Sequence, residues 1–176
     1  MKRILSTLVV ALAAVAAFAQ PGWRDRLKSQ MPLMGHRNWI VVVDSAYPLQ
    51  SSQGIETIYT GEDQLSVVKT VLAEIKKQRH VRANVFLDKE LKFVDDKAAP
   101  GISSYRNSLA KVLKGASAAS EKHEDIIDML DTASKTFHVI VLKTKLTLPY
   151  TSVFFQLDCG YWSADKEKAM RKKMGG

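Results

Sequence analysis

The sequence predicts an α/β domain with a largely parallel sheet flanked by helices. Apolar, β-branched runs alternate along the chain with segments of helical periodicity, an order typical of such domains. The run 39–43 is apolar throughout, as expected for a strand covered on both faces. The chain has 176 residues, 46% of them hydrophobic, which is enough for one domain with its own core.

The first half of the domain contains two expected helices and three expected strands. A short basic helix over 23–31 precedes the strand at 39–43, and a shorter β-type run follows at 55–60. The segment 62–78 is the strongest helix prediction, because four apolar residues recur on one helical face: Leu65, Val68, Leu72 and Ile75. A second β-type run, over 81–87, is interrupted by Arg82 and Asn84.

The second half repeats the alternation after a loop at 95–101. An amphipathic helix is expected over 103–114, ended by Gly115. The small residues of 115–120 indicate a turn or linker. A helix over 125–133 and strands over 137–142 and 152–157 complete the domain.

Residues 1–19 have the pattern of a secretory signal peptide. Lys2 and Arg3 precede an apolar run over 4–18, and Ala17-Phe18-Ala19 forms an A-x-A cleavage site. The run is short for a membrane span, which needs about 20 residues. We therefore expect export to the periplasm or the medium without a stable membrane anchor; a retained N-terminal anchor is the alternative.

The net charge of +8 does not indicate a nucleic-acid-binding protein. Much of the basic excess lies in the segment 164–176, where no aromatic or base-reading motif accompanies it. A solvated C-terminal tail is the simpler interpretation. Cys159 is the single cysteine, so no intramolecular disulfide is possible, and we expect it to behave as a small buried hydrophobe.

One stretch carries residues suited to chemistry. Gly35-His36 precedes the strand at 39–43, and Asp44 ends that strand, where open α/β sheets tend to hold ligands. A histidine and a carboxylate together can move protons at neutral pH. His36 lies outside the strand, so a turn at Gly35 or a neighbouring subunit must bring it to that site. The alternatives are a structural His36 and an Asp44 that only caps the next turn.

Two later segments agree with this one in order and spacing. They are Tyr105-Arg106-Asn107-Ser108-Leu109, and the strand pair formed by 137–142 and 149–155. Together with the Gly-His and Asp motif, they resemble the D-ribose pyranase and L-fucose mutarotase family. The resemblance implies one sugar mutarotase-like domain over 20–163, between the signal peptide and the basic tail.

The resemblance also implies the site. His36 would be catalytic, and the sugar-binding residues would be Asp44, His123, Tyr150, Thr151 and Ser152. It implies a homo-oligomeric ring and a reaction that needs no cofactor. Two residues depart from the family pattern: Asn38 replaces an aspartate, and Ser152 replaces an asparagine, whose amide has longer reach.

Three functions therefore remain open. The first is an exported mutarotase or pyranase-like isomerase that interconverts the cyclic forms of an aldose by histidine-assisted ring opening. The second is a non-catalytic secreted carbohydrate-binding protein on the same fold, and the third is an oligomeric envelope protein without a sugar ligand. No metal site is predicted, because the histidines lack HxH or HExxH spacing. No glycine-rich phosphate loop is present either.

Overall fold

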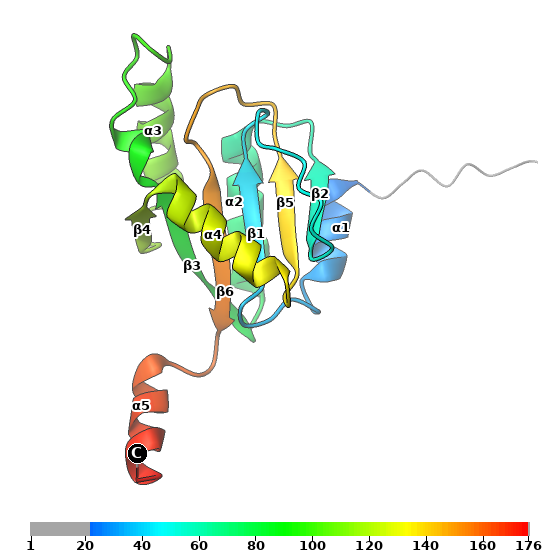
Figure 1. Cartoon of the computed structure of the whole chain (residues 1–176), viewed down its shortest axis with the longest axis vertical. Coiled ribbons are helices and arrows are strands. Elements are labelled where there is room, and N and C mark those ends of the chain that lie inside the picture. The colour runs from blue at the N-terminus through cyan, green and yellow to red at the C-terminus, as the bar shows by residue number, and fades with distance from the viewer. Residues whose placement is uncertain (1–21, 176) are drawn as a thin grey trace, which may run out of the picture.

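The structure, a computed structural model that describes residues 22–175, contains six strands and five α-helices (Figure 1). The strands are β1 (Trp39–Val43), β2 (Ile55–Tyr59), β3 (Val81–Asp88), β4 (Ala118–Glu121), β5 (Val139–Lys143) and β6 (Val153–Cys159). The helices are α1 (Trp23–Gln30), α2 (Gln64–Lys77), α3 (Ile102–Val112), α4 (His123–Ser134) and α5 (Ala164–Lys173), and a 3-10 turn covers Lys89–Lys92. The predicted signal peptide lies outside the described residues.

The six strands form one sheet in the order β2-β5-β1-β6-β3-β4. Strand β5 is parallel to β1 and to β2, and β3 is parallel to β4. Strand β6 is antiparallel to both of its neighbours, β1 and β3. Five strands therefore run in one direction and β6 alone opposes them. This confirms the predicted α/β domain with a largely parallel sheet.

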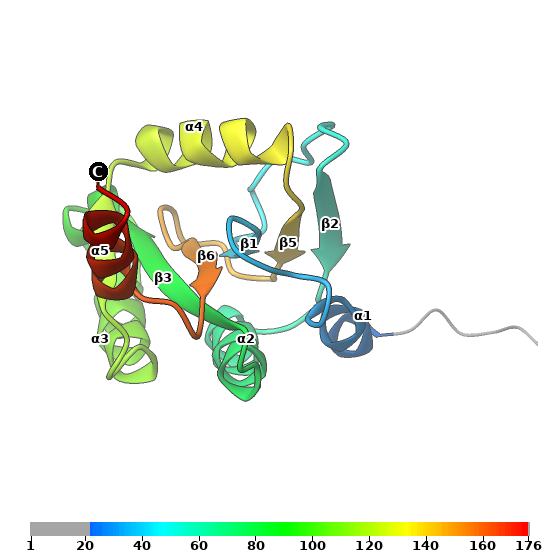
Figure 2. The ribbon, with the colours of Figure 1, turned by 90° about the horizontal axis from the view of Figure 1, so that it is seen from below.

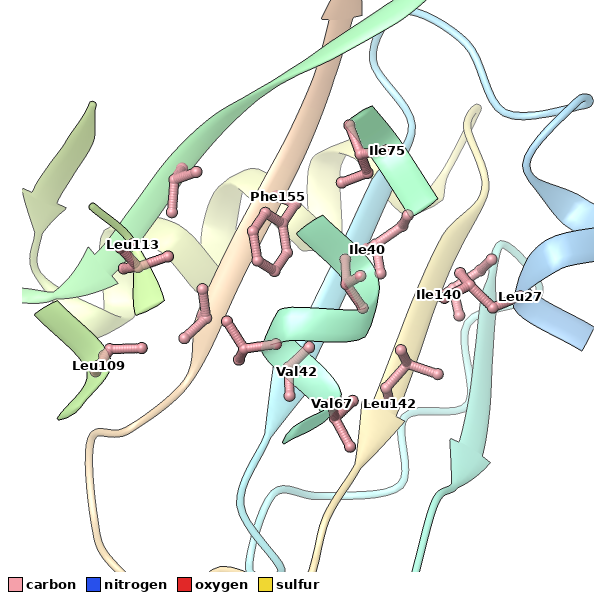
Figure 3. Close-up of a cluster of buried hydrophobic side chains, with 14 of the residues drawn as sticks. Leu27, Ile40, Val42, Val67, Ile75, Leu109, Leu113, Ile140, Leu142 and Phe155 are labelled. Carbon is pink, nitrogen blue, oxygen red and sulfur yellow. The ribbon is translucent and has the colours of Figure 1, made fainter. Parts of the chain in front are cut away.

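Helices cover both faces of the sheet, with α4 on one side and α1, α2 and α3 on the other (Figure 2). Successive strand residues point to opposite faces, so each central strand serves two cores. Ile40 and Val42 join the larger cluster with α1–α3, whereas Val41 packs with Ile126 and Leu130 of α4. Figure 3 shows the larger cluster, in which Phe155 of β6 lies against side chains of α2 and β1.

The buried face of α2 is turned relative to the predicted one. Leu65 and Leu72 are only partly buried, and the fully covered positions are Gln64, Val67, Val68, Val71 and Ile75. Asp63 caps the helix by accepting a hydrogen bond from the backbone N–H of Ser66 at 3.0 Å. A polar side chain, Gln64, therefore enters the core at the first turn of α2.

The prediction of a turn or linker over 115–120 was wrong in part, because Ala118–Glu121 forms the edge strand β4. Its residues are small and mostly exposed, so they carry no apolar signal of a strand. The segment expected as a basic tail contains α5, which Ser163 caps and which buries no side chain. Among residues 22–175, no helix is long and apolar enough to cross a membrane.

Candidate functional site

Two aspartates and one loop meet at the same edge of the sheet. Asp44 follows β1 and Asp88 ends β3, and both strands run in the same direction. Strand β6 lies between them and runs the other way, so the residues that enter it, 150–152, lie between the two carboxylates. We call Asp44, Asp88, His123, Tyr150 and Ser152 the edge site.

The edge site is built around an ion pair between Asp88 and His123. Nδ1 of His123 lies 2.9 Å from Oδ1 of Asp88, whose side chain is fully buried. Oδ2 of Asp88 is buried and has no hydrogen-bond partner among the described residues. Glu90 accepts hydrogen bonds from the backbone N–H of His123 at 3.1 and 3.2 Å, which fixes the first turn of α4. The imidazole is therefore oriented, with Nε2 as the ring nitrogen available to a ligand.

The pair is arranged to hold a proton. Burial raises the pKa of the Asp88 carboxyl above its usual value, and the hydrogen bond from His123 only partly offsets this. The hydrogen bond to Asp88 raises the pKa of His123 in turn, with a smaller contribution from the charge of Asp44. A partly exposed histidine that a buried carboxylate orients, and whose pKa that carboxylate raises, can act as a general acid and base.

The raised pKa values predict how stability depends on pH. Both groups bind protons more tightly in the folded than in the unfolded chain, so each makes the free energy of unfolding fall as pH rises: Asp88 from its ordinary pKa of 3.8 upward, and His123 from 6.5 upward. The variant Asp88→Asn removes the carboxyl and returns the pKa of His123 towards 6.5. We therefore expect the stability of the wild type relative to this variant to decrease as pH rises, first above 3.8 as Asp88 loses its proton and again above 6.5 as His123 does.

Urea unfolding at several pH values measures this difference directly. The matched control is Asp125→Asn, which removes an exposed carboxylate from the same region of α4. A difference between wild type and Asp88→Asn that stays constant with pH would contradict the proton-holding role of the pair.

Tyr150 places an aromatic ring beside the pair. Its ring lies 5.8 Å from that of His123 at an interplanar angle of 82°, and the side chain is 41% exposed. The backbone of Tyr150 has a φ of 55°, a left-handed conformation that is uncommon for a residue with a large side chain. Such strain is typical of functional sites, and here it accompanies a phenol that faces solvent next to an imidazole.

A buried polar network supports the 150–152 segment from below. The hydroxyl of Tyr105 donates to the backbone carbonyl of Thr151 at 2.9 Å, and the Gln64 amide donates both to that carbonyl and to the Tyr105 hydroxyl. Thr144 donates its hydroxyl to Oε1 of Gln64 at 3.0 Å. The side chain of Thr151 is bound to the carbonyl of Leu148. Thr151 therefore holds the loop in place from a fully buried position.

Asp44 serves partly as a cap. Its Oδ1 accepts a hydrogen bond from the backbone N–H of Ala46 at 2.7 Å, which is the capping alternative considered from the sequence. Its charge nevertheless reaches the pair, since it contributes to the raised pKa values of both Asp88 and His123. Ser152 is 1% exposed and lies directly before β6.

His36 lies at the opposite end of β1 from Asp44. Its Nδ1 is 2.8 Å from Oδ1 of Asp158, which Arg82 also binds at 2.6 Å. A cavity of about 800 Å³ opens beside it, between α4 and the sheet. A single chain therefore does not bring His36 to the edge site.

Asn38, which departs from the family pattern, and the two remaining histidines all have hydrogen-bond partners within the fold. Asn38 closes the turn before β1, accepting a hydrogen bond from the N–H of Gly35 at 2.7 Å. His138 lies 3.3 Å from Glu56, and His80 lies 2.9 Å from the carbonyl oxygen of Met34. Cys159 is a free, half-buried thiol. Within residues 22–175, no three potential ligands from His, Cys, Asp and Glu converge to hold a metal ion.

Sequence reasoning did not find Asp88, Gln64 or the supporting role of Tyr105. A signal for Asp88 was present, because it ends a β-type run as Asp44 does. No comparable signal marked Gln64, which looks like an ordinary polar residue at a helix start.

Comparisons with known proteins place this arrangement on a known fold. The structure matches RbsD of Bacillus subtilis complexed with D-ribose, with 17% identity and a TM-score of 0.53 over 80% of this chain and 98% of that chain. It also matches the fucose mutarotase of Streptococcus pneumoniae in complex with L-fucose, with 17% identity and a TM-score of 0.52 over 76% of this chain and 91% of that one. FucU from Bifidobacterium longum matches with 13% identity and a TM-score of 0.52, over 76% of this chain and 94% of that chain.

No family model matches the sequence, and no curated protein matches it either. The relation therefore rests on structure, and at these identities it shows a shared fold. The predicted resemblance to the ribose pyranase and fucose mutarotase family is confirmed at that level.

Proposed function

We propose that this protein binds a monosaccharide at the edge site and accelerates the interconversion of its cyclic forms. The observation that carries the proposal is the oriented Asp88–His123 pair, with Tyr150 against the imidazole, at the carboxyl edge of the sheet. Open α/β sheets hold ligands at this edge. Two of the structures that share the fold contain D-ribose and L-fucose, which supports a sugar as the ligand.

The chemistry needs one group that both accepts and donates a proton. Neutral His123 accepts the proton of the anomeric hydroxyl at Nε2 as the carbonyl forms at C1 and the bond from C1 to the ring oxygen breaks. The ring oxygen then takes this proton from Nε2 of His123, which becomes neutral again. Rotation of the carbonyl followed by the reverse transfers closes the other form. Asp88 keeps the imidazole in one tautomer and stabilises its charged state. The residues present suffice for this step without a covalent intermediate.

Assembly and location belong to the proposal as well. We propose a homo-oligomeric ring in which a neighbouring copy brings His36 towards the edge site, since its own chain places it at the far end of β1. We also propose export, because residues 1–19 carry the signal-peptide pattern. Light scattering of the purified protein, and mass spectrometry of its N-terminus from the native host, test these two points separately.

A non-catalytic carbohydrate-binding role is the second candidate. Ser152 favours it, because a buried serine offers a ligand fewer and shorter contacts than the asparagine typical of the resembled family. Saturation-transfer and exchange NMR against a panel of aldoses separates the candidates. Faster anomer exchange supports the isomerase, and binding without faster exchange supports the second role. If neither binding nor faster exchange is observed, both candidates are rejected, and the protein has this fold without a sugar ligand.

If a neighbouring copy brings His36 to the edge site, His36→Ala should affect the reaction. We expect slower anomer exchange with unchanged stability, because the side chain of His36 is 56% exposed and contributes little packing. Exchange NMR measures the first effect and urea unfolding the second. Arg82→Ala is the matched control, since it removes the other partner of Asp158 and leaves His36 in place. Unchanged exchange in His36→Ala would exclude this residue from the reaction.

A further inference from the structure

Helix α5 is exposed along its whole length. It projects from the end of β6 away from the sheet (Figure 1), and none of its side chains is buried. Gly160 anchors the preceding chain by donating its N–H to the carbonyl of His80 at 2.9 Å. Only 161–163 separate this anchor from the helix, so α5 leaves the domain on a short connection.

The helix carries uncompensated positive charge. Arg171 pairs with Glu167 at 2.7 Å, and Nζ of Lys166 contacts the carbonyl of Tyr161 at 3.2 Å. Lys168 and Lys172 are exposed and make no ion pair with any residue of the described chain. Their spacing of four residues stacks them on one face of α5, which we call the basic stripe.

The opposite charge lies on α4, on the side that faces away from the sheet. Ile126 and Leu130 fix the buried side of α4, and its exposed residues include four acids: Glu124, Asp125, Asp128 and Asp131. No lysine or arginine occurs within His123–Ser134, and His123 lies in its first turn against Asp88. We call these four carboxylates the acidic face of α4. Glu124 and Asp128 repeat the four-residue spacing of the basic stripe.

We infer that α5 docks on the acidic face of α4 in a second copy of this chain. The two surfaces have complementary charge and the same spacing, and the short connection directs α5 away from its own α4 (Figure 1). A membrane surface is a weaker partner, because Asp165 and Glu167 interrupt the positive charge and α5 has no continuous apolar stripe. A contact between two short helices is small, so by itself the α5–α4 contact is weak and sensitive to salt.

Zero-length carbodiimide cross-linking tests the contact, since it joins a lysine amine to a carboxylate. Full-length protein is prepared in unlabelled and ¹⁵N-labelled forms and mixed, and cross-linked peptides are identified by mass spectrometry. We expect α5–α4 cross-links that combine the two isotopic forms. Reversing the stripe with Lys168→Glu and Lys172→Glu should lower their yield about tenfold, because two exposed attractions become repulsions.

Mixing two charge-reversed variants gives the sharpest result. Asp125→Lys with Asp128→Lys reverses two of the four charges of the acidic face and should likewise weaken the α5–α4 contact between copies of that variant. When this variant is mixed with the α5 variant, both contacts between unlike copies become attractive. Mixed cross-links should therefore return, both between the new Glu and Lys residues and between the native basic stripe and the native acidic face. Lys69→Glu with Lys76→Glu, on the exposed side of α2, is the control of equal charge change and should behave as the wild type.

Three outcomes would overturn the inference. Cross-links confined to one isotopic form would place α5 on its own α4. Absence of α5–α4 cross-links in the wild type would remove the contact altogether. Sedimentation with phosphatidylglycerol vesicles that the α5 reversal abolishes, without recovery of cross-links in the mixture, would assign α5 to a membrane surface. The α5 variants retain the fold in every case, because the altered side chains are exposed.

Discussion

Replacing His123 by alanine is expected to slow anomer exchange by about 10²- to 10⁴-fold, the usual contribution of a positioned acid–base group. The imidazole is the group of the edge site that the structure both orients and leaves half-exposed, through its contact of 2.9 Å with Asp88. Exchange NMR on a bound aldose gives the rate, and saturation transfer reports binding in the same sample. Binding should persist, since Asp44 and Tyr150 remain.

A second variant separates catalysis from folding. His123→Ala leaves the buried Asp88 carboxyl without its partner, whereas His123→Gln keeps a side-chain amide that can donate to it but cannot exchange a proton near neutral pH. Both variants should lose exchange, and His123→Gln should retain more stability. His138→Ala, which removes a histidine outside the edge site, is the matched control. Unchanged exchange in His123→Gln would reject His123 as the proton-transfer group.

Replacing Gln64 by alanine is expected to lower the free energy of unfolding by about 2–4 kcal/mol. The side chain is fully buried, and its amide joins the Tyr105 hydroxyl, the Thr151 carbonyl and the Thr144 hydroxyl. Removing it leaves several buried polar groups with fewer partners, and the cost of each is large in an apolar surrounding. The loop that carries Tyr150 loses its support, so sugar affinity should fall as well.

Urea unfolding and saturation-transfer NMR measure the two consequences of Gln64→Ala. Gln78→Ala is the control, because that glutamine lies at the other end of α2 and its partly buried side chain donates to the carbonyl of Glu74 at 3.4 Å. We expect less than about 0.5 kcal/mol for the control. A similar loss in both variants would mean that the network does not support the loop.

Much of the fold could be predicted because its signals are local. The run Trp39–Val43 was predicted with its observed bounds, and the helix centred on 62–78 is α2. Apolar periodicity reports such elements directly, because each must bury one face. Strand β4 was not predicted, because an exposed edge strand of mostly small residues buries too little side-chain surface to show an apolar pattern in the sequence. The antiparallel direction of β6 was not predicted either, since the apolar pattern of a strand is the same whichever way the strand runs in the sheet.

The candidate site was predicted unevenly. His123 and Tyr150 were proposed through a family resemblance, and the structure brings their rings together. Asp88 was missed although it is the partner of His123, 35 positions away in sequence. His36 was grouped with Asp44 because one short segment contains both, yet an extended strand places its two ends far apart.

Local patterns therefore sufficed to predict the fold class, the central strand, the main helices and the chemical types of residue available for proton transfer. These follow from apolar periodicity and composition, which act over a few neighbouring residues. Which of those residues meet depends on the assembled sheet. The order β1-β6-β3 places the 150–152 loop between Asp44 and Asp88, and the start of α4 places His123 at the same edge. Strand order and direction arise from long-range packing of the whole sheet, which no local pattern encodes.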